Sequence, residues 1–369
     1  MKKFIKPNWK KSNLNISATL AEFLGAPNNN KTLKILKKEL AKGYKNVVFI
    51  CLDGMGMYPI KKHLSKDSLL RKNIKMVLRS TFPSTTTNAT TSLTSNKLPL
   101  QHGWFGWTLH FDVVDRNIDL YKNRDSQTGE QIEFKYPIFD NSICYFDNVN
   151  SEYEINPILP IYVKTQIENK KIVIENESDL VNSIKQVCLR PGKQFVYAYL
   201  SQPDATMHDF GVSSDQANQK IKSISNEIEK LYSDLTDTLI IITADHGQID
   251  VAGCVDFYKD KEINDMLLCT PFLDARTPAF KVKTGKEKEF KKLFKSRYGK
   301  DFKLFKTIDL IRRGYFGESG DYGYLLGDYI AIGTYTHKLF ISYENMTSFK
   351  GHHTSLTEEM LVPLIILKS

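Results

Sequence analysis

Long apolar runs and paired cysteines are both missing from this chain of 369 residues. No window approaches the roughly 18 uncharged apolar residues of a membrane-spanning helix, so we expect no membrane partner. The five cysteines are scattered and form no Cys-x-x-Cys pair, which fits free thiols in a reducing compartment. The first residues, MKKFIKPNWKK, carry the positive charge of a signal peptide but not its apolar stretch. We therefore expect a cytoplasmic protein.

The composition is otherwise that of an ordinary globular protein, with 41% hydrophobic and 25% charged residues. Its length allows one large domain or two moderate ones. The 51 Lys and Arg residues outnumber the 42 Asp and Glu residues, and the net charge of +9 suits an anionic substrate. A Lys-rich solvated surface explains the same excess more simply. Charge alone therefore does not indicate a nucleic-acid partner.

Four apolar runs are typical of buried strands, and three of them end in acidic or imidazole side chains. These runs are KNVVFICLDG, QFVYAYLSQPD, DTLIIITADHG and MLVPLIILKS, the last spanning Leu361 to Leu367. The first delivers Asp53, the second Asp204, and the third Asp245 with His246. Helical patterns separate the runs, and Ser213–Leu235 is a clear amphipathic example. This alternation predicts an α/β fold with a doubly wound, mainly parallel sheet and helices on both faces.

The pattern changes after Cys254, where a segment of a different kind begins. It contains a strand, a basic helix and a second strand: Ala279–Val282, Glu287–Arg297 and Phe302–Phe305. A glycine-rich turn and a further strand follow before Tyr335. We therefore predict a core built from residues 1–254 and 336–369, with residues 255–335 inserted as a small α+β cap.

The side chains at the strand ends form a set that is suited to metal ions. Asp204 and His208 lie four residues apart, so on a helical turn both face the same way. The segment GHHTSLTEEM adds His352 and His353 just before the last strand. A single strand-end Asp is commonly a helix N-cap, but three converging clusters are harder to explain in that way. Mixed carboxylate and imidazole ligation suits Zn²⁺, or Mn²⁺ where oxygen ligands dominate.

A tract rich in hydroxyl groups follows the first strand. Ser80–Ser95 is STFPSTTTNATTSLTS, and eleven of its sixteen residues are Ser or Thr. Such tracts are usually loops, yet apolar runs flank this one on both sides. The alternative is that one of these hydroxyls is a nucleophile that a metal ion activates.

Together these motifs resemble the alkaline phosphatase superfamily, and within it the type I phosphodiesterase/nucleotide pyrophosphatase family. The resemblance covers about residues 46–103, 194–249 and 351–367. It implies an alkaline-phosphatase-like fold and two divalent metal ions, usually zinc, side by side at the carboxyl edge of the sheet. One ion would be held by Asp204, His208 and His353, and the other by Asp53, Thr86, Asp245 and His246.

Two of these assignments rest on spacing within the family motifs. In similar bacterial proteins the late ligand is the His of a Gly-x-His segment, which selects His353 over its neighbour His352. The family nucleophile is a Thr that lies three residues after a Pro and sixteen before a His-Gly pair. Pro83 and His102 fit that spacing if the nucleophile is Thr86.

Thr86 would attack from a helix start, where free backbone N–H groups favour an anion, and would form a covalent phosphothreonine intermediate. The flanking Thr85 and Thr87 stay open as alternatives. One family position differs, because Trp107 replaces the Asn that donates to the phosphoryl oxygen. The donor would then be a backbone N–H near Thr86 or the amide of Asn88. Two roles are open for Trp107: stacking on a base, or packing in the core.

The leading hypothesis is a two-metal hydrolase that cleaves phosphodiester or phosphoanhydride bonds of a small phosphorylated substrate, for example a nucleotide. The alternatives within the superfamily are a phosphonate hydrolase and a phosphomonoesterase. A sulfatase is disfavoured, because FPSTTT lacks the Arg of the sulfatase motif. A catalytically inactive binding module would require a lost ligand or nucleophile. The basic helix Glu287–Arg297 leaves nucleic-acid binding as a last hypothesis, which predicts a steep salt dependence.

Overall fold

A computed structural model describes residues 2–133, 136, 138, 143–341 and 348–369 of the chain. Its centre is a seven-stranded sheet in the order β2–β17–β9–β1–β8–β6–β7. β1 pairs in parallel with β8 and β9, and β6 pairs in parallel with β7 and β8. The seven strands are β1 Asn46–Leu52, β2 Ile74–Arg79, β6 Tyr153–Leu159, β7 Ile172–Val173, β8 Lys193–Leu200, β9 Thr238–Thr243 and β17 Leu361–Lys368. The prediction of a mainly parallel α/β sheet is confirmed.

The last strand, β17, runs antiparallel to both of its neighbours, β2 and β9. Its continuous apolar run resembles those of the parallel strands, because such a run indicates burial on both faces and carries no information about direction. The chain reaches Leu361 from the edge where β1 and β9 end, since the loop containing His353 lies there. From that edge the strand has to run back across the sheet.

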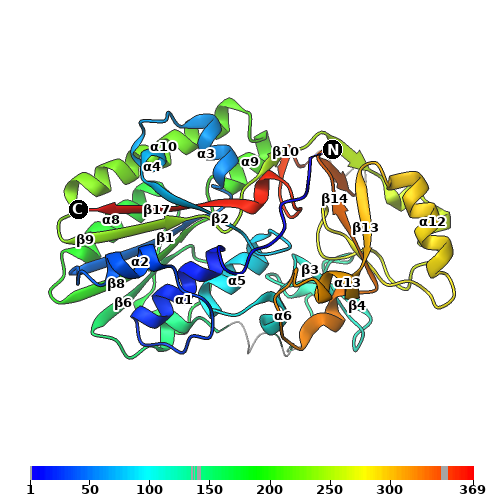
Figure 1. The fold of residues 1–369 in the computed structure, drawn as a ribbon, viewed down its shortest axis with the longest axis horizontal. Helices are drawn as coiled ribbons and strands as arrows, with labels where there is room; N and C mark the ends of the chain where they lie inside the picture. The colour runs from blue at the N-terminus through cyan, green and yellow to red at the C-terminus, as the bar shows by residue number, and fades with distance from the viewer. Residues whose placement is uncertain (1, 134–135, 137, 139–142, 342–347) are drawn as a thin grey trace.

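Helices cover both faces of the sheet (Figure 1). One face carries α1 Asn13–Phe23, α2 Lys34–Leu40 and α5 Thr86–Ser95. The other carries α3 Met57–His63, α4 Leu69–Lys72, α8 Glu177–Cys188, α9 Asp204–Phe210 and α10 Asp215–Asp234. The predicted amphipathic helix is α10, and it buries Ile221, Ile224, Ile228 and Leu231. Burial of one apolar stripe on the sheet is the main source of stability for such a helix.

Beyond one end of the sheet lies a second lobe with small sheets of its own (Figure 1). One of them contains β3 Thr108–Phe111, β4 Arg116–Asp119 and β5 Arg124–Asp125. Another contains β12 Ala279–Phe280, β13 Phe302–Lys306 and β14 Tyr329–Gly333. The lobe and the links to it also hold α6 Pro99–His102, β10 Ile249–Asp250, β11 Gly253–Val255, α11 Lys261–Asn264, α12 Glu287–Tyr298, α13 Thr307–Arg312, β15 Lys338–Phe340 and β16 Gly351–His352. The strand, helix and strand that the sequence predicts after Cys254 correspond to β12, α12 and β13.

Two separate parts of the chain build the core of this second lobe. One apolar cluster joins Leu109 and Ile118 with Phe272 and Leu310. Another contains Phe290 and Phe294 of α12. β11 pairs in parallel with β15, which brings the two ends of the segment between them together. The lobe therefore combines the β3–β5 hairpins with the segment predicted as an insertion.

The five cysteines form no disulfide, and all are free thiols. Cys51, Cys188 and Cys254 are buried, whereas Cys144 and Cys269 are half-buried. Of the helices described, none combines the length and the apolar character needed to cross a bilayer.

Candidate metal centre

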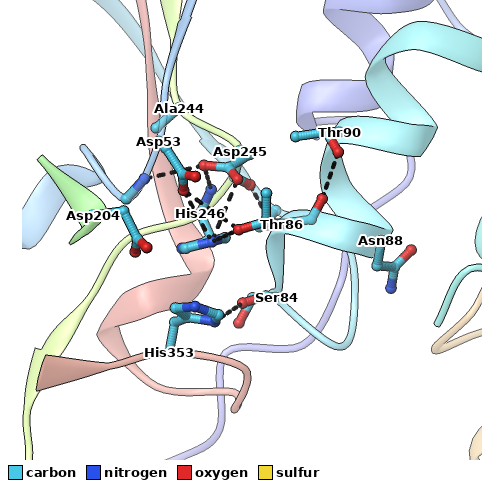
Figure 2. A network of polar contacts seen from close by, with 12 residues as sticks. Asp53, Ser84, Thr86, Asn88, Thr90, Asp204, Ala244, Asp245, His246 and His353 are labelled. Atoms are coloured by element: carbon cyan, nitrogen blue, oxygen red, sulfur yellow. Dashed lines mark hydrogen bonds and ion pairs between the residues drawn. The ribbon is translucent and has the colours of Figure 1, made fainter. Parts of the chain in front are cut away.

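Acidic and imidazole side chains converge at the carboxyl edge of the central sheet. Asp53 follows β1, Asp204 begins α9 directly after β8, and Asp245 and His246 follow β9. They form two groups whose potential ligand atoms all lie within 4.8 Å of one another: Asp53, Asp245 and His246 in one, and Asp204, His208 and His353 in the other. Figure 2 shows Asp53, Asp245, His246 and Thr86 side by side, with Asp204 and His353 next to them. This is the edge at which ligand sites form in doubly wound sheets.

In the first group the backbone orients the carboxylate of Asp245. Its Oδ1 accepts hydrogen bonds from the N–H of His246 at 2.8 Å and of Gly54 at 3.1 Å. Its Oδ2 is buried and has no hydrogen-bond partner among the described residues, and it lies 3.4 Å from Nε2 of His246. A buried carboxylate oxygen without a donor is costly, so this atom is suited to binding a cation.

In the second group a glutamine orients the carboxylate of Asp204. Oδ1 accepts a hydrogen bond of 2.6 Å from Nε2 of Gln248, and Oδ2 lies 3.3 Å from Nε2 of His208. Gly54 has a φ of +69°, and a Cβ placed there would lie 2.8 Å from Oδ1 of Asp204. Only glycine fits at this position, because the backbone passes directly over the carboxylate.

His246 and His353 share one tautomer. Nδ1 of His246 donates to the carbonyl of Gly247 at 2.9 Å, and Nδ1 of His353 donates to the carbonyl of Ser84 at 3.1 Å. Nε2 of each ring is therefore free of a proton when the ring is neutral, which is the form that binds metal ions. The two rings lie 3.8 Å apart between centroids and so connect the two groups.

Burial opposes charge on every one of these groups. It raises the pKa of Asp53 and of Asp204 well above the usual range, and the neighbouring carboxylates raise each pKa further. Burial raises the pKa of Asp245 to about 6. It also lowers the pKa of His353 far below its usual value, with a smaller contribution from His246. Such a set repels its own ionised carboxylates unless divalent cations offset their charge, so the residues present fit a metal centre.

Thr86 lies at the same place, as the first residue of α5. Its Oγ1 is 3.1 Å from Nε2 of His246 and 3.5 Å from Oδ1 of Asp53. Four later hydroxyls of the tract bond within the helix; Thr90, for example, donates to the carbonyl of Thr86, and Thr91 to that of Thr87. The part of the hydroxyl-rich tract from Thr86 onward is thus a helix whose first side chain contacts both His246 and Asp53.

The neighbouring imidazoles of His352 and His353 point to different partners. His353 belongs to the group with Asp204 and His208. Nδ1 of His352 accepts a hydrogen bond from the backbone N–H of His353 at 2.9 Å, and its Nε2 lies 3.7 Å from Asp274. Burial raises the pKa of Asp274 to about 7. His352 therefore lies beside the centre and outside the ligand groups.

The sequence predicts that Asn88 and Trp107 contact substrate, and the two side chains have different surroundings in the structure. Asn88 is buried, its amide donates to the carbonyl of Pro83 at 3.0 Å, and it lies apart from the two groups in Figure 2. Its placement therefore gives no support to a role in substrate binding. Trp107 is 37% exposed and packs edge-on against Tyr121, with centroids 5.8 Å apart. Nζ of Lys122 lies 5.8 Å from the centroid of its ring.

Two residues that contact the centre are not predicted from the sequence. Gln248 binds Asp204, and the hydroxyl of Tyr199 donates to Oδ2 of Asp53. Gln248 follows His246 by two residues, and Tyr199 is the second-last residue of β8, close to the carboxyl edge. Both therefore lie near ligands in the sequence, but a neutral side chain in an apolar or turn context carries no metal-binding signal.

Comparison with known proteins identifies a family. The sequence model of the type I phosphodiesterase/nucleotide pyrophosphatase family matches residues 47–295. No curated protein matches the chain.

Among solved structures, murine ectonucleotide pyrophosphatase/phosphodiesterase 5 has a TM-score of 0.62 at 15% identity, covering 88% of each chain. Phosphonoacetate hydrolase from Sinorhizobium meliloti 1021, in complex with phosphonoformate, has a TM-score of 0.61 at 14% identity, covering 87% of this chain and 89% of the other. These similarities establish the fold alone, whereas the family match covers more than half of the chain. The chain thus belongs to the type I phosphodiesterase/nucleotide pyrophosphatase family, and it is a metal-dependent hydrolase of that type.

Proposed function

We propose that the protein hydrolyses a phosphodiester or phosphoanhydride bond in a small phosphorylated substrate, with Thr86 as the nucleophile. The observation that carries this proposal is the position of the Thr86 hydroxyl, 3.1 Å from Nε2 of His246 at the start of α5. No other hydroxyl of α5 with a described hydrogen bond contacts a residue of either ligand group.

Two divalent ions, Zn²⁺ in this proposal, would complete the centre. One would be held by Asp204, His208 and His353, and the other by Asp53, Thr86, Asp245 and His246. When bound, these ions supply positive charge that favours the alkoxide of the nucleophile and offsets charge on the attacking and leaving oxygens.

The chain itself provides the nucleophile and a positive helix end. Oγ1 of Thr86 attacks phosphorus and gives up its proton, the bond from phosphorus to the leaving oxygen breaks, and the leaving group takes up a proton. Water then attacks the same phosphorus and releases the phosphoryl group, and Thr86 regains a proton. Thr85, the N-cap, makes no side-chain capping bond. The N–H groups of the first turn of α5 are therefore available to the phosphoryl oxygens.

A flat, anionic substrate suits the surface beside Thr86. Thr90, one turn along α5, shares a hydrogen bond of 2.9 Å with the hydroxyl of Tyr121. Tyr121 and Trp107 are both partly exposed. A base can stack on such rings, and Lys122 provides a positive charge next to them. The inactive form of the murine structure was solved in complex with AMP, and we propose a nucleotide-like substrate here.

A phosphonate hydrolase is the second candidate, because the phosphonoacetate hydrolase structure covers nearly as much of the chain as the murine structure does. Zinc-loaded protein should be tested on bis-p-nitrophenyl phosphate, p-nitrophenyl phosphate, a nucleotide p-nitrophenyl ester and phosphonoacetate. We expect the two diesters to be the best substrates, with the nucleotide ester preferred. Turnover of phosphonoacetate alone would replace the diesterase proposal with the second candidate.

A further inference from the structure

The hydroxyl of Tyr199 donates a hydrogen bond to Oδ2 of Asp53. Tyr199 lies in β8, and Asp53 directly follows the adjacent parallel strand β1, in which Cys51 is in register with Tyr199. Side chains alternate between the faces of a strand, so Tyr199, Cys51 and Asp53 share a face. The strand pairing continues one step beyond β1, where the N–H of Asp53 donates to the carbonyl of Leu200 at 2.9 Å. The ring of Tyr199 is thus held against the carboxylate by the main sheet.

The two oxygens of Asp53 consequently have different surroundings. Oδ2 accepts from Tyr199, whereas Oδ1 lies 3.4 Å from Nε2 of His246 and 3.5 Å from Oγ1 of Thr86. Asp53 is only 3% exposed, so water is not a general substitute for the phenolic donor. Without that donor the carboxylate is free to rotate about its Cβ–Cγ bond, since terminal carboxylate torsions are broad.

We propose that Tyr199 is a positioning residue for the metal centre. Its hydroxyl holds Oδ2 and thereby directs Oδ1 of Asp53 at the ion shared with Thr86 and His246. This inference rests on the proposed function, in which Asp53 is a ligand. Hydrogen-bonded partners of ligands commonly change metal affinity by about 10–100-fold when they are removed.

The same strand contains a matched control. Tyr197 precedes Tyr199 by two residues and therefore lies on the same face of β8. Its hydroxyl donates to Oδ1 of Asp147 at 2.7 Å and lies 3.1 Å from Oγ1 of Thr165. Neither partner belongs to a ligand group. Tyr197→Phe therefore removes a hydroxyl from the same strand without touching the metal centre.

The test is a zinc titration of apo-protein against a chromophoric chelator, comparing wild type, Tyr199→Phe and Tyr197→Phe. We expect Tyr199→Phe to weaken one of two zinc equivalents by about 10–100-fold and to leave the other unchanged. Tyr197→Phe should bind both equivalents as wild type does. Excess zinc should restore most of the kcat of Tyr199→Phe, and the melting temperature of its apo-form should stay close to that of Tyr197→Phe.

Unchanged zinc affinity in Tyr199→Phe would overturn the inference, and so would an equal loss at both sites, which indicates a general structural role. Asp53→Asn distinguishes these failures from a failure of the proposed function. If Asp53→Asn loses one equivalent while Tyr199→Phe keeps both, Asp53 is a ligand and only the role of Tyr199 is wrong. If Asp53→Asn keeps both equivalents, the ligand set itself is wrong.

Discussion

Oγ1 of Thr86 lies 3.1 Å from Nε2 of His246, and this contact joins the first turn of α5 to the loop that follows β9. The two residues are 160 positions apart in the chain. Their contact places a hydroxyl beside a ring whose Nδ1 is already occupied by the carbonyl of Gly247. The proposed nucleophile and a potential ligand nitrogen therefore lie in direct contact.

Thr86→Ala should reduce kcat by about 10³-fold or more, because loss of a nucleophile removes the covalent route. Its metal content, measured by elemental analysis, should stay at the wild-type value. Thr86→Ser should keep part of the activity, since it retains the hydroxyl. Mass spectrometry of a quenched single turnover should find the phosphoryl group on the peptide that contains Thr86. Wild-type rates in Thr86→Ala would mean that a neighbouring Thr or water attacks directly.

Removal of metal should abolish turnover. The three buried carboxylates have raised pKa values, so the empty centre takes up protons that bound cations would displace. Dialysis against a chelator should eliminate activity, and Zn²⁺ or Mn²⁺ should restore it. Zinc binding should also release protons, which calorimetry in buffers of different ionisation enthalpy can count. Active protein without any bound divalent metal would contradict this prediction.

The adjacent imidazoles provide a test of the ligand set. His353→Ala should lose one zinc equivalent and most of the activity, because Nε2 of His353 is directed at Asp204 and His208. His352→Ala should cost at most about 10–100-fold, since its ring contacts Asp274 and the backbone of His353. The metal content and kcat of both variants show which of the two histidines is the ligand. Equal losses, or the reverse order, would shift the assignment to His352.

Gly54→Ala should disrupt the centre for steric reasons. A Cβ at this position would lie 2.8 Å from Oδ1 of Asp204 and so displace the carboxylate. Gly192 is a suitable control, because its φ of +75° is similar to that of Gly54 and a Cβ there meets nothing within 4 Å. Both variants should lose about 1–2 kcal/mol of stability to left-handed backbone strain. Only Gly54→Ala should also lose zinc affinity, and equal zinc binding in the two variants would exclude the steric explanation.

The sequence alone determined where the potential metal ligands gather. Asp53, Asp204 and Asp245 each follow a continuous apolar run, and the helical patterns between these runs favour parallel strands, whose carboxyl ends share one edge. The spacing of Asp204 and His208 is equally local, because residues four apart on a helix face the same way. A short-range pattern is sufficient for these residues, whereas the choice of Thr86 depended on the spacing of a family motif.

Only the tertiary structure decided which side chains hold the potential metal ligands in place. The contact of Tyr199 with Asp53 depends on the register between β8 and β1, and that of Gln248 with Asp204 on the path of the chain after β9. The direction of β17 is likewise absent from its apolar run. The amide of Asn88 turns to Pro83 because of the rotational phase of α5. Register, direction and phase are relations between segments far apart in the chain, and no local pattern encodes them.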